Sequence, residues 1–212
     1  MKLYSYWRSS AAFRVRIALN LKGLAFEYAP VNLAPSANEQ LGEPYMSMNP
    51  EGRVPMLEYQ GRRLGQSMAI LEWLDETFTD PPLLPVDPWD KAGCRAFANT
   101  IACDIHPLNN LSVLRKLTHE FGADDAATTR WYHDWIGRGF AALESTAAAS
   151  THDFVFGERP TLAEVLLVPQ IWNARRFGMD MGRFPALIEI EARCYALPAF
   201  ENARPENQPD AV

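Results

Sequence analysis

The sequence predicts an α/β domain followed by an all-helical domain, and three observations support this fold class. Residues 1–80 alternate short strand-like runs with amphipathic helical runs. Residues 80–90, DPPLLPVDPWD, contain four prolines, which prevent a continuous helix and favour a stiff connector. The remaining sequence shows helical patterns without a convincing pair of strands. We therefore expect an N-terminal domain over 1–80, a proline-rich linker over 81–90 and a helical domain over 91–212.

The N-terminal domain is expected to begin with a strand, a helix and a second strand. Residues 2–7 alternate like a strand, and the apolar spacing from Ser10 onwards is helical until Lys22 and a glycine end it. Residues 26–33 read as the second strand, and the proline within them suggests an edge position. Such a unit brings its two strands together in parallel through a right-handed crossover.

The rest of this domain predicts the order β-α-β-α-β-β-α. Residues 54–59, VPMLEY, read as a strand, and after the turn QGRR the run LGQ reads as a short paired strand. We expect Ser67 to cap the helix that follows, whose apolar face recurs at helical spacing.

Beyond the linker, four or five helices are expected between residues 88 and 202. Thr161 and Glu164 have the spacing of a capping box at the start of an apolar helix. The last residues, RPENQPDAV, contain no periodic pattern, and we expect a loose tail there.

Composition excludes several classes of protein. The net charge of -6 disfavours a nucleic-acid binder, and no apolar run approaches the roughly 20 residues that span a bilayer. The three cysteines form no CxxC pair and the four histidines lack ligand spacing, so we expect no metal site. No secretory signal is visible, and the expected location is the cytoplasm.

Ser9 and Ser10 stand between Arg8 and the start of the first helix, which is a favourable place for an anion. A helix N-terminus presents unpaired N–H groups and positive dipole. A thiol held there has a lowered pKa and is more often the nucleophilic thiolate. The alternative is that either serine is only the cap of the helix.

Five motifs, taken together, resemble the zeta class of the glutathione transferases, whose members include glutathione-dependent maleylpyruvate and maleylacetoacetate isomerases. The motifs run in order through the chain: SSAAFRVRIAL, NPEGRVP, QSMAI, HPLNNLSVL and LVPQIWNARRF. The resemblance implies a thioredoxin-like N-terminal domain, glutathione as cofactor and a homodimer.

The resemblance also implies which residues bind glutathione. Ser9 and Ser10 would hold its sulfur, and a cis Val54-Pro55 would pair with its cysteinyl part. Gln66 and Ser67 would grip its γ-glutamyl end, and Gln40 its glycyl end. Other members of the cleft would be His106, Asn110 and Ser112; we expect His106 and Asn110, four residues apart, to share one helix face. The alternatives are a solvated loop amide for Gln40, an ordinary X-Pro bond for Val54-Pro55, and packing or a local hydrogen bond for His106.

Ala11 departs from the family pattern, which commonly has cysteine at this position. The reacting sulfur would then come from bound glutathione. Arg8 and Arg176 match positions where a guanidinium fork can hold a carboxylate, and two of them suit a substrate with an acid group at each end. Arg14 and Arg16 are expected on a solvated or interdomain face.

The resemblance implies a cis–trans isomerase that converts maleylpyruvate to fumarylpyruvate by reversible addition of the glutathione thiolate, in the breakdown of gentisate-type aromatics. Catalysis would rest on Arg8, Ser9, Ser10 and Arg176. The alternatives are a maleylacetoacetate isomerase, a conjugating or dehalogenating transferase, and a non-enzymatic interaction protein. The last would lose the glutathione pocket, whose residues are present here.

Overall fold

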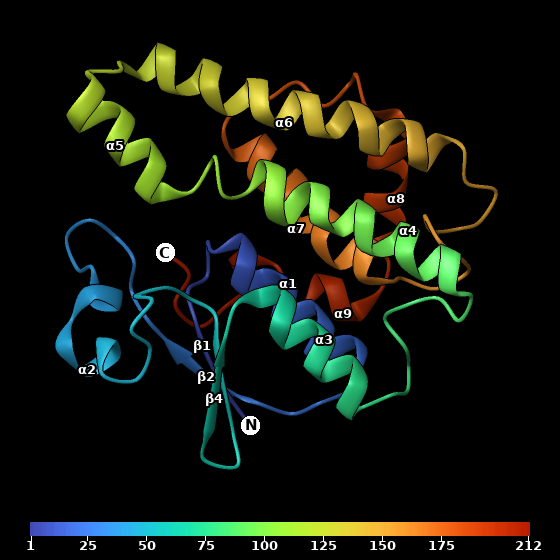
Figure 1. The fold of residues 1–212 in the computed structure, drawn as a ribbon, viewed down its shortest axis with the longest axis horizontal. Coiled ribbons are helices and arrows are strands. Elements are labelled where there is room, and N and C mark those ends of the chain that lie inside the picture. Colours follow the sequence, from blue (N-terminus) through green and yellow to red (C-terminus); the bar gives the residue numbers. More distant parts are fainter. The chain divides into compact units, whose positions relative to one another are not determined.

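The strand β1 (Lys2–Ser5) lies inside a four-stranded sheet of the computed structural model, which describes residues 1–212 (Figure 1). The strand order is β2-β1-β3-β4. β2 (Glu27–Pro30) is parallel to β1, β3 (Met56–Tyr59) is antiparallel to β1, and β4 (Arg62–Gly65) is antiparallel to β3. The predicted strand–helix–strand unit is confirmed, and β2 is an edge strand, as its proline suggested.

Two helices and one short helical segment complete this part of the fold. α1 (Ser10–Leu21) packs against α3 (Ser67–Thr77), and a 3₁₀ turn followed by α2 (Glu43–Met46) connects β2 to β3. The predicted order β-α-β-α-β-β-α is therefore observed. Buried apolar side chains of the sheet and of both longer helices form the core; they include Leu3, Phe13, Ile17, Leu57, Ile70 and Leu74.

The chain divides into two compact units. The first contains Met1–Leu83 together with Tyr195–Val212, and the second contains Leu84–Cys194. The C-terminal segment thus belongs with the sheet, whereas the sequence placed it in the helical domain. Within the first unit, α1 contacts the short helix α9 (Pro198–Glu201), and Asn20 Nδ2 donates to the carbonyl of Ala199 at 3.0 Å.

The prediction of a loose tail is wrong, because the last residues form hydrogen bonds with other residues of the first unit. Asp210 accepts hydrogen bonds from the backbone N–H of Trp7 at 3.1 Å and from the hydroxyl of Tyr28 at 2.6 Å. A short 3₁₀ turn over Pro205–Asn207 precedes it. A segment without periodic pattern is held here by single polar contacts.

The second unit is helical, with five longer helices, in agreement with the four or five predicted. α4 begins at Pro88, within the segment expected to be a linker, because proline is accepted in the first turn of a helix. A π-helical turn, Thr100–Ile105, continues α4. The helices are α4 (Pro88–Asn99), α5 (Leu111–Phe121), α6 (Asp125–Ala148), α7 (Leu162–Arg176) and α8 (Pro185–Tyr195).

The predicted capping box at the start of α7 is confirmed. The carboxylate of Glu164 accepts from the N–H groups of Thr161 at 2.7 Å and Val155 at 2.8 Å. Glu164 is fully buried, and burial raises the pKa of its carboxyl group. None of the helices combines the length and apolar composition needed to cross a bilayer.

Candidate active site

Strand register brings three of the predicted segments to one edge of the sheet. Met56, the first residue of β3, pairs with Tyr4 near the end of β1 and with Gly65 at the end of β4. The loop after β1, the residues before β3 and the residues after β4 therefore meet at this edge. Each of these segments carries residues that the sequence assigned to glutathione.

The N-terminus of α1 offers two unpaired donors. Ser9 is the N-cap: its hydroxyl accepts from the N–H of Ala12 at 3.2 Å, and its own N–H donates to the carbonyl of Tyr6 at 2.9 Å. The N–H groups of Ser10 and Ala11 have no partner within the chain. Ser10 is 5% exposed, and its hydroxyl makes no hydrogen bond within the chain. Two free N–H groups and one free hydroxyl at a helix N-terminus favour an anion.

Arg8 lies directly before these serines. Its guanidinium donates to the hydroxyl of Tyr6 at 2.9 Å and lies 5.0 Å from the ring centroid of Trp7. It forms no ion pair. Aromatic contacts thus orient a guanidinium whose charge no carboxylate of the chain neutralises.

The peptide bond between Val54 and Pro55 is cis, as the resemblance implied. Val54 is buried in a cluster with Tyr6, Tyr45 and Met56. Its N–H and carbonyl groups make no hydrogen bond within the chain, so both are open to a further extended segment.

The start of α3 is a second helix N-terminus without a side-chain cap. Gln66, with φ of 64°, is the N-cap residue, and Ser67 is the first helical residue; the prediction that Ser67 caps this helix is wrong. The Gln66 amide instead donates to Glu51 at 2.6 Å. The Ser67 hydroxyl accepts from the guanidinium of Arg14 at 3.2 Å. This terminus therefore combines uncapped N–H groups with a nearby cationic side chain.

Arg14 and Arg16 were expected on a solvated or interdomain face, and the solvated alternative is wrong. They are 2% and 1% exposed. α1 is packed on almost all sides, so helical spacing does not separate its buried face from a solvated one. Arg16 is held by the hydroxyl of Ser5 and by the backbone carbonyls of Tyr6, Trp7 and Ala203.

Gln40 is buried, contrary to the alternative of a solvated loop amide. It is 6% exposed, and its amide nitrogen donates to the side chain of Asn38 at 3.4 Å. Its amide oxygen is buried without a partner. An unpaired acceptor is costly in a folded chain, which favours a ligand donor at this position.

In the second unit, α6 holds the C-terminal end of α7, where Arg176 lies. The Arg176 guanidinium donates to the amide oxygen of Asn173 at 3.5 Å and lies 4.8 Å from the ring centroid of Phe177. Asn173 in turn donates to the hydroxyl of Tyr132, and the Tyr132 ring stacks on Phe177 at 3.8 Å. Sequence reasoning missed Asn173 and Tyr132; the only available signal was the three-residue spacing between Asn173 and Arg176.

The prediction that His106 and Asn110 share a helix face is wrong. The π-helical turn ends at Ile105, and the chain then forms turns until α5 begins. Asn110 is the N-cap of α5, and its side-chain oxygen accepts from the N–H and hydroxyl groups of Ser112, both at 3.1 Å. Asn110 and Ser112 therefore hold each other at the helix start.

All three cysteines lie in the second unit. Cys94 and Cys194 are buried, and burial raises the pKa of the Cys94 thiol to about 11 and that of Cys194 well above its ordinary range. Cys103 is exposed. The first unit, which contains the N-terminus of α1, therefore has no thiol.

Comparison with known proteins agrees with this arrangement. The family model for the glutathione S-transferase N-terminal domain matches residues 1–76. The chain is 47% identical to a probable maleylacetoacetate isomerase of Vibrio cholerae, over 99% of this chain and 97% of that protein. It is 44% identical to the maleylpyruvate isomerase of a Ralstonia species, over the full length of both.

Two solved structures extend the comparison. The holo structure of a bacterial zeta-class maleylpyruvate isomerase superposes with a TM-score of 0.97 at 43% identity, over the full length of both chains. A maleylacetoacetate isomerase of Anaeromyxobacter dehalogenans, with dicarboxyethyl glutathione and citrate bound in its active site, superposes with a TM-score of 0.87 at 43% identity, over 100% of this chain and 93% of that one. The predicted glutathione transferase fold, a thioredoxin-like domain followed by a helical domain, is confirmed. The chain belongs to the family of the maleylpyruvate and maleylacetoacetate isomerases, in the zeta class of the glutathione S-transferases.

Proposed function

We propose that this chain is a glutathione-dependent cis–trans isomerase that converts maleylpyruvate to fumarylpyruvate. The sequence is 44–47% identical to a maleylpyruvate isomerase and to maleylacetoacetate isomerases over at least 99% of this chain, which supports the reaction class. The observation that carries the mechanism is the anion site at the start of α1 in a unit that contains no cysteine. The first unit supplies no sulfur of its own, and we infer that the nucleophilic sulfur belongs to bound glutathione.

The residues at the sheet edge fit glutathione. The γ-glutamyl carboxylate of glutathione would accept hydrogen bonds from the uncapped N–H groups at the start of α3, beside Ser67. The ammonium group of glutathione would donate to the side-chain oxygens of Gln66 and Glu51. Its cysteinyl backbone matches the open N–H and carbonyl groups of Val54, beside Pro55. We propose that Gln40 binds near the glycyl end, through the amide that is only partly satisfied within the chain.

Glutathione supplies a thiolate that adds reversibly to the electron-poor double bond, which permits rotation before the thiolate leaves. The N–H groups of Ser10 and Ala11 and the hydroxyl of Ser10 would stabilise the anionic sulfur, with Ser9 holding the helix start in place. A serine hydroxyl donates a hydrogen bond to sulfur without competing as a nucleophile. With Ala11 where the family commonly has cysteine, the start of α1 carries no thiol of its own.

Arg8 and Arg176 would each bind one carboxylate of the substrate. Both guanidinium groups are oriented by aromatic rings. A fixed guanidinium binds a carboxylate with two parallel hydrogen bonds, at little further loss of side-chain freedom. We also propose His106, Asn110 and Ser112 as binding residues. Asn110 would bind through its amide nitrogen, because its amide oxygen caps α5.

The second candidate activity is maleylacetoacetate isomerisation, which several close relatives carry in their names. A conjugating transferase is the other alternative; it would consume glutathione. We also propose, from the family, a homodimer located in the cytoplasm.

An absorbance assay on both isomerase substrates, with and without glutathione, tests the proposal. We expect turnover only with glutathione, a higher kcat/KM for maleylpyruvate, and unchanged total thiol at the end. Arg176→Ala should raise KM for the substrate about tenfold or more, since a charge-assisted hydrogen bond contributes about 1.5–3 kcal/mol. The exposed Arg159→Ala is the matched control and should leave KM unchanged. Glutathione-independent turnover, or loss of thiol in proportion to product, would contradict the proposal.

A further inference from the structure

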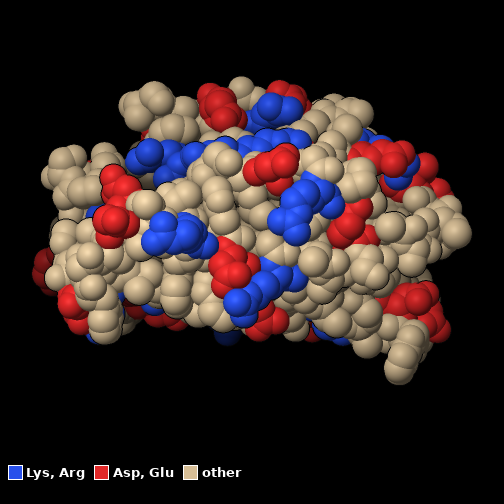
Figure 2. Space-filling view, turned by 90° about the horizontal axis from the view of Figure 1, so that it is seen from above, with Lys and Arg blue, Asp and Glu red and all other residues tan.

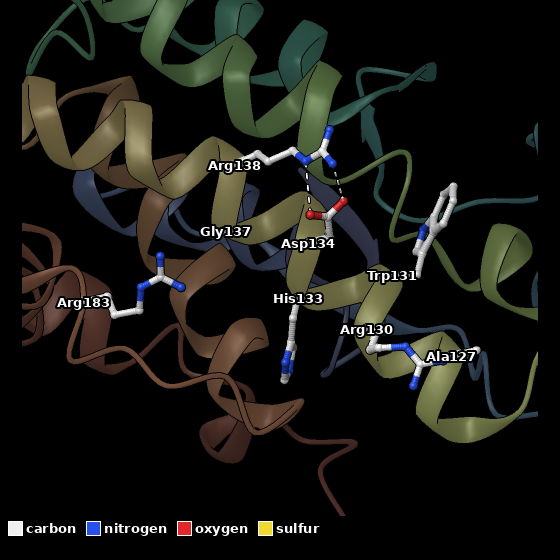
Figure 3. A pocket seen from close by; sticks show the side chains of 8 residues that line it. All are labelled: Ala127, Arg130, Trp131, His133, Asp134, Gly137, Arg138 and Arg183. Atoms are coloured by element: carbon white, nitrogen blue, oxygen red, sulfur yellow. Dashed lines mark hydrogen bonds and ion pairs between the residues drawn. The ribbon is translucent and has the colours of Figure 1, made fainter.

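A groove of about 790 Å³ runs along the outer face of α6 (Figure 3). Seven of its eight lining residues lie on α6, between Ala127 and Arg138. Arg183 comes from the segment between α7 and α8 and borders the other side. Figure 2, seen from above Figure 1, shows lysine and arginine side chains interspersed with acidic side chains across this face. The residues that line the groove are Ala127, Arg130, Trp131, His133, Asp134, Gly137, Arg138 and Arg183.

The groove carries positive charge although the chain is acidic, with a net charge of -6. Its one carboxylate, Asp134, is neutralised by Arg138, which contacts it at 2.8 Å. Arg130 and Arg183 form no ion pair. Figure 3 shows these two guanidinium groups on opposite sides of His133. Two separate cations therefore remain without an acidic partner in one concave surface.

His133 adds a third polar group between the two arginines. Its Nε2 lies 2.8 Å from the carbonyl oxygen of Phe177, which can only accept, so this nitrogen carries the hydrogen. Nδ1 is left as the ring nitrogen open to a ligand.

We propose that this groove is a second anion site, formed by residues other than those of the proposed active site, that binds an extended dicarboxylate. Arg130 and Arg183 each take one carboxylate, and His133 contacts the ligand between them. A guanidinium binds a carboxylate or a phosphate with the same fork geometry, but two separated cations favour a ligand with two separated acid groups over a single compact anion. Trp131 provides an apolar wall at one end of the groove.

An NMR titration with succinate, in the absence of glutathione, tests the site. Succinate has no double bond to accept a thiol, so the reaction cannot interfere. We expect saturable shifts of the Trp131 indole N–H and the Gly137 amide signals, with the indole assigned through Trp131→Phe. Inorganic phosphate is the comparison probe and should bind at least tenfold more weakly.

Matched arginine variants separate this site from the active site. Arg130→Gln and Arg183→Gln should each weaken the groove shifts about tenfold or more. Arg159→Gln, an exposed arginine outside the groove, and Arg176→Gln should leave them unchanged. Loss of the shifts in Arg176→Gln alone, full binding in both groove variants, equal binding of phosphate, or no saturable shift in the wild-type chain would each overturn the proposal. Circular dichroism establishes that every variant is folded.

Discussion

Arg16 is a buried cation that organises the segment in front of the candidate anion site. One guanidinium donates to the carbonyls of Tyr6, Trp7 and Ala203 and to the hydroxyl of Ser5. Burial lowers its pKa to about 10, which leaves it charged at neutral pH. The sequence could not reveal this role, because an arginine at helical spacing is usually solvated and α1 has no solvated face.

Ser9 and Ser10 can be separated by their effects on stability. Ser9→Ala removes the cap of α1 and should lower the free energy of unfolding by about 1 kcal/mol. Ser10→Ala breaks no hydrogen bond within the chain and should change it by less than about 0.5 kcal/mol. If Ser10 donates to the thiolate, its loss raises the thiol pKa of bound glutathione, so the rise of kcat/KM with pH moves to higher pH. Urea unfolding and a pH–rate profile measure both effects, and an unchanged profile in Ser10→Ala would contradict the assigned donor.

The cysteines differ in reactivity by their burial. Only a thiolate is alkylated, and the raised pKa of about 11 keeps Cys94 protonated at pH 8; Cys194 is shifted in the same direction. We expect iodoacetamide to modify one thiol in the folded chain, that of Cys103, and all three after unfolding. Mass spectrometry counts the adducts. Cys103→Ser is the control and should remain unmodified while folded; rapid labelling of Cys94 would show that this core opens readily.

Among the elements, those with local signals were predictable and those set by tertiary contacts were not. The capping box of α7 and the proline on the edge strand are local patterns, and both were confirmed. The π-helical turn Thr100–Ile105 was missed, because its sequence continues the helical pattern of α4. The π-helical turn lies close to α6: the side chain of Ile105 occupies the space that a Cβ on Gly139 of α6 would need.

Two glycines of α6 test this close approach. A Cβ on Gly139 would lie 2.3 Å from Cδ1 of the fully buried Ile105, so Gly139→Ala should destabilise the chain by about 1–3 kcal/mol. A Cβ on Gly137 would meet only Met179, at 3.6 Å, so Gly137→Ala should be neutral or stabilise by up to about 1 kcal/mol. Urea unfolding measures both variants. Equal effects of the two substitutions would show that the π-helical turn does not press on α6.

At the scale of the whole molecule, the C-terminal segment returns to the first unit and supports its candidate site. The carboxylate of Asp210 accepts a hydrogen bond from the N–H of Trp7, which lies two residues before Ser9. The order of the elements and the two-part organisation follow from sequence patterns, but this return depends on one side chain in a segment without periodicity. Neither composition nor spacing distinguishes such a contact from a loose tail.

Replacing Asp210 should therefore weaken both folding and glutathione binding. Asp210→Ala leaves the Trp7 N–H and the Tyr28 hydroxyl without their acceptor and should lower the free energy of unfolding by about 1–3 kcal/mol. We also expect a higher KM for glutathione, because the loop before α1 is no longer held. Asp210→Asn should have a smaller effect, and removal of the fully exposed Val212 should have none. If Asp210→Ala lowers stability but leaves KM for glutathione unchanged, this contact contributes to stability and not to glutathione binding.

The central claim is that the chain provides an anion site at the start of α1 and that bound glutathione provides the sulfur. A crystal structure with glutathione bound tests it most directly. The sulfur should lie within hydrogen-bonding distance of the hydroxyl of Ser9 or Ser10, in front of the N–H groups of Ser10 and Ala11. A sulfur that lies away from this helix terminus, with the tripeptide otherwise bound at the sheet edge, would contradict the mechanism.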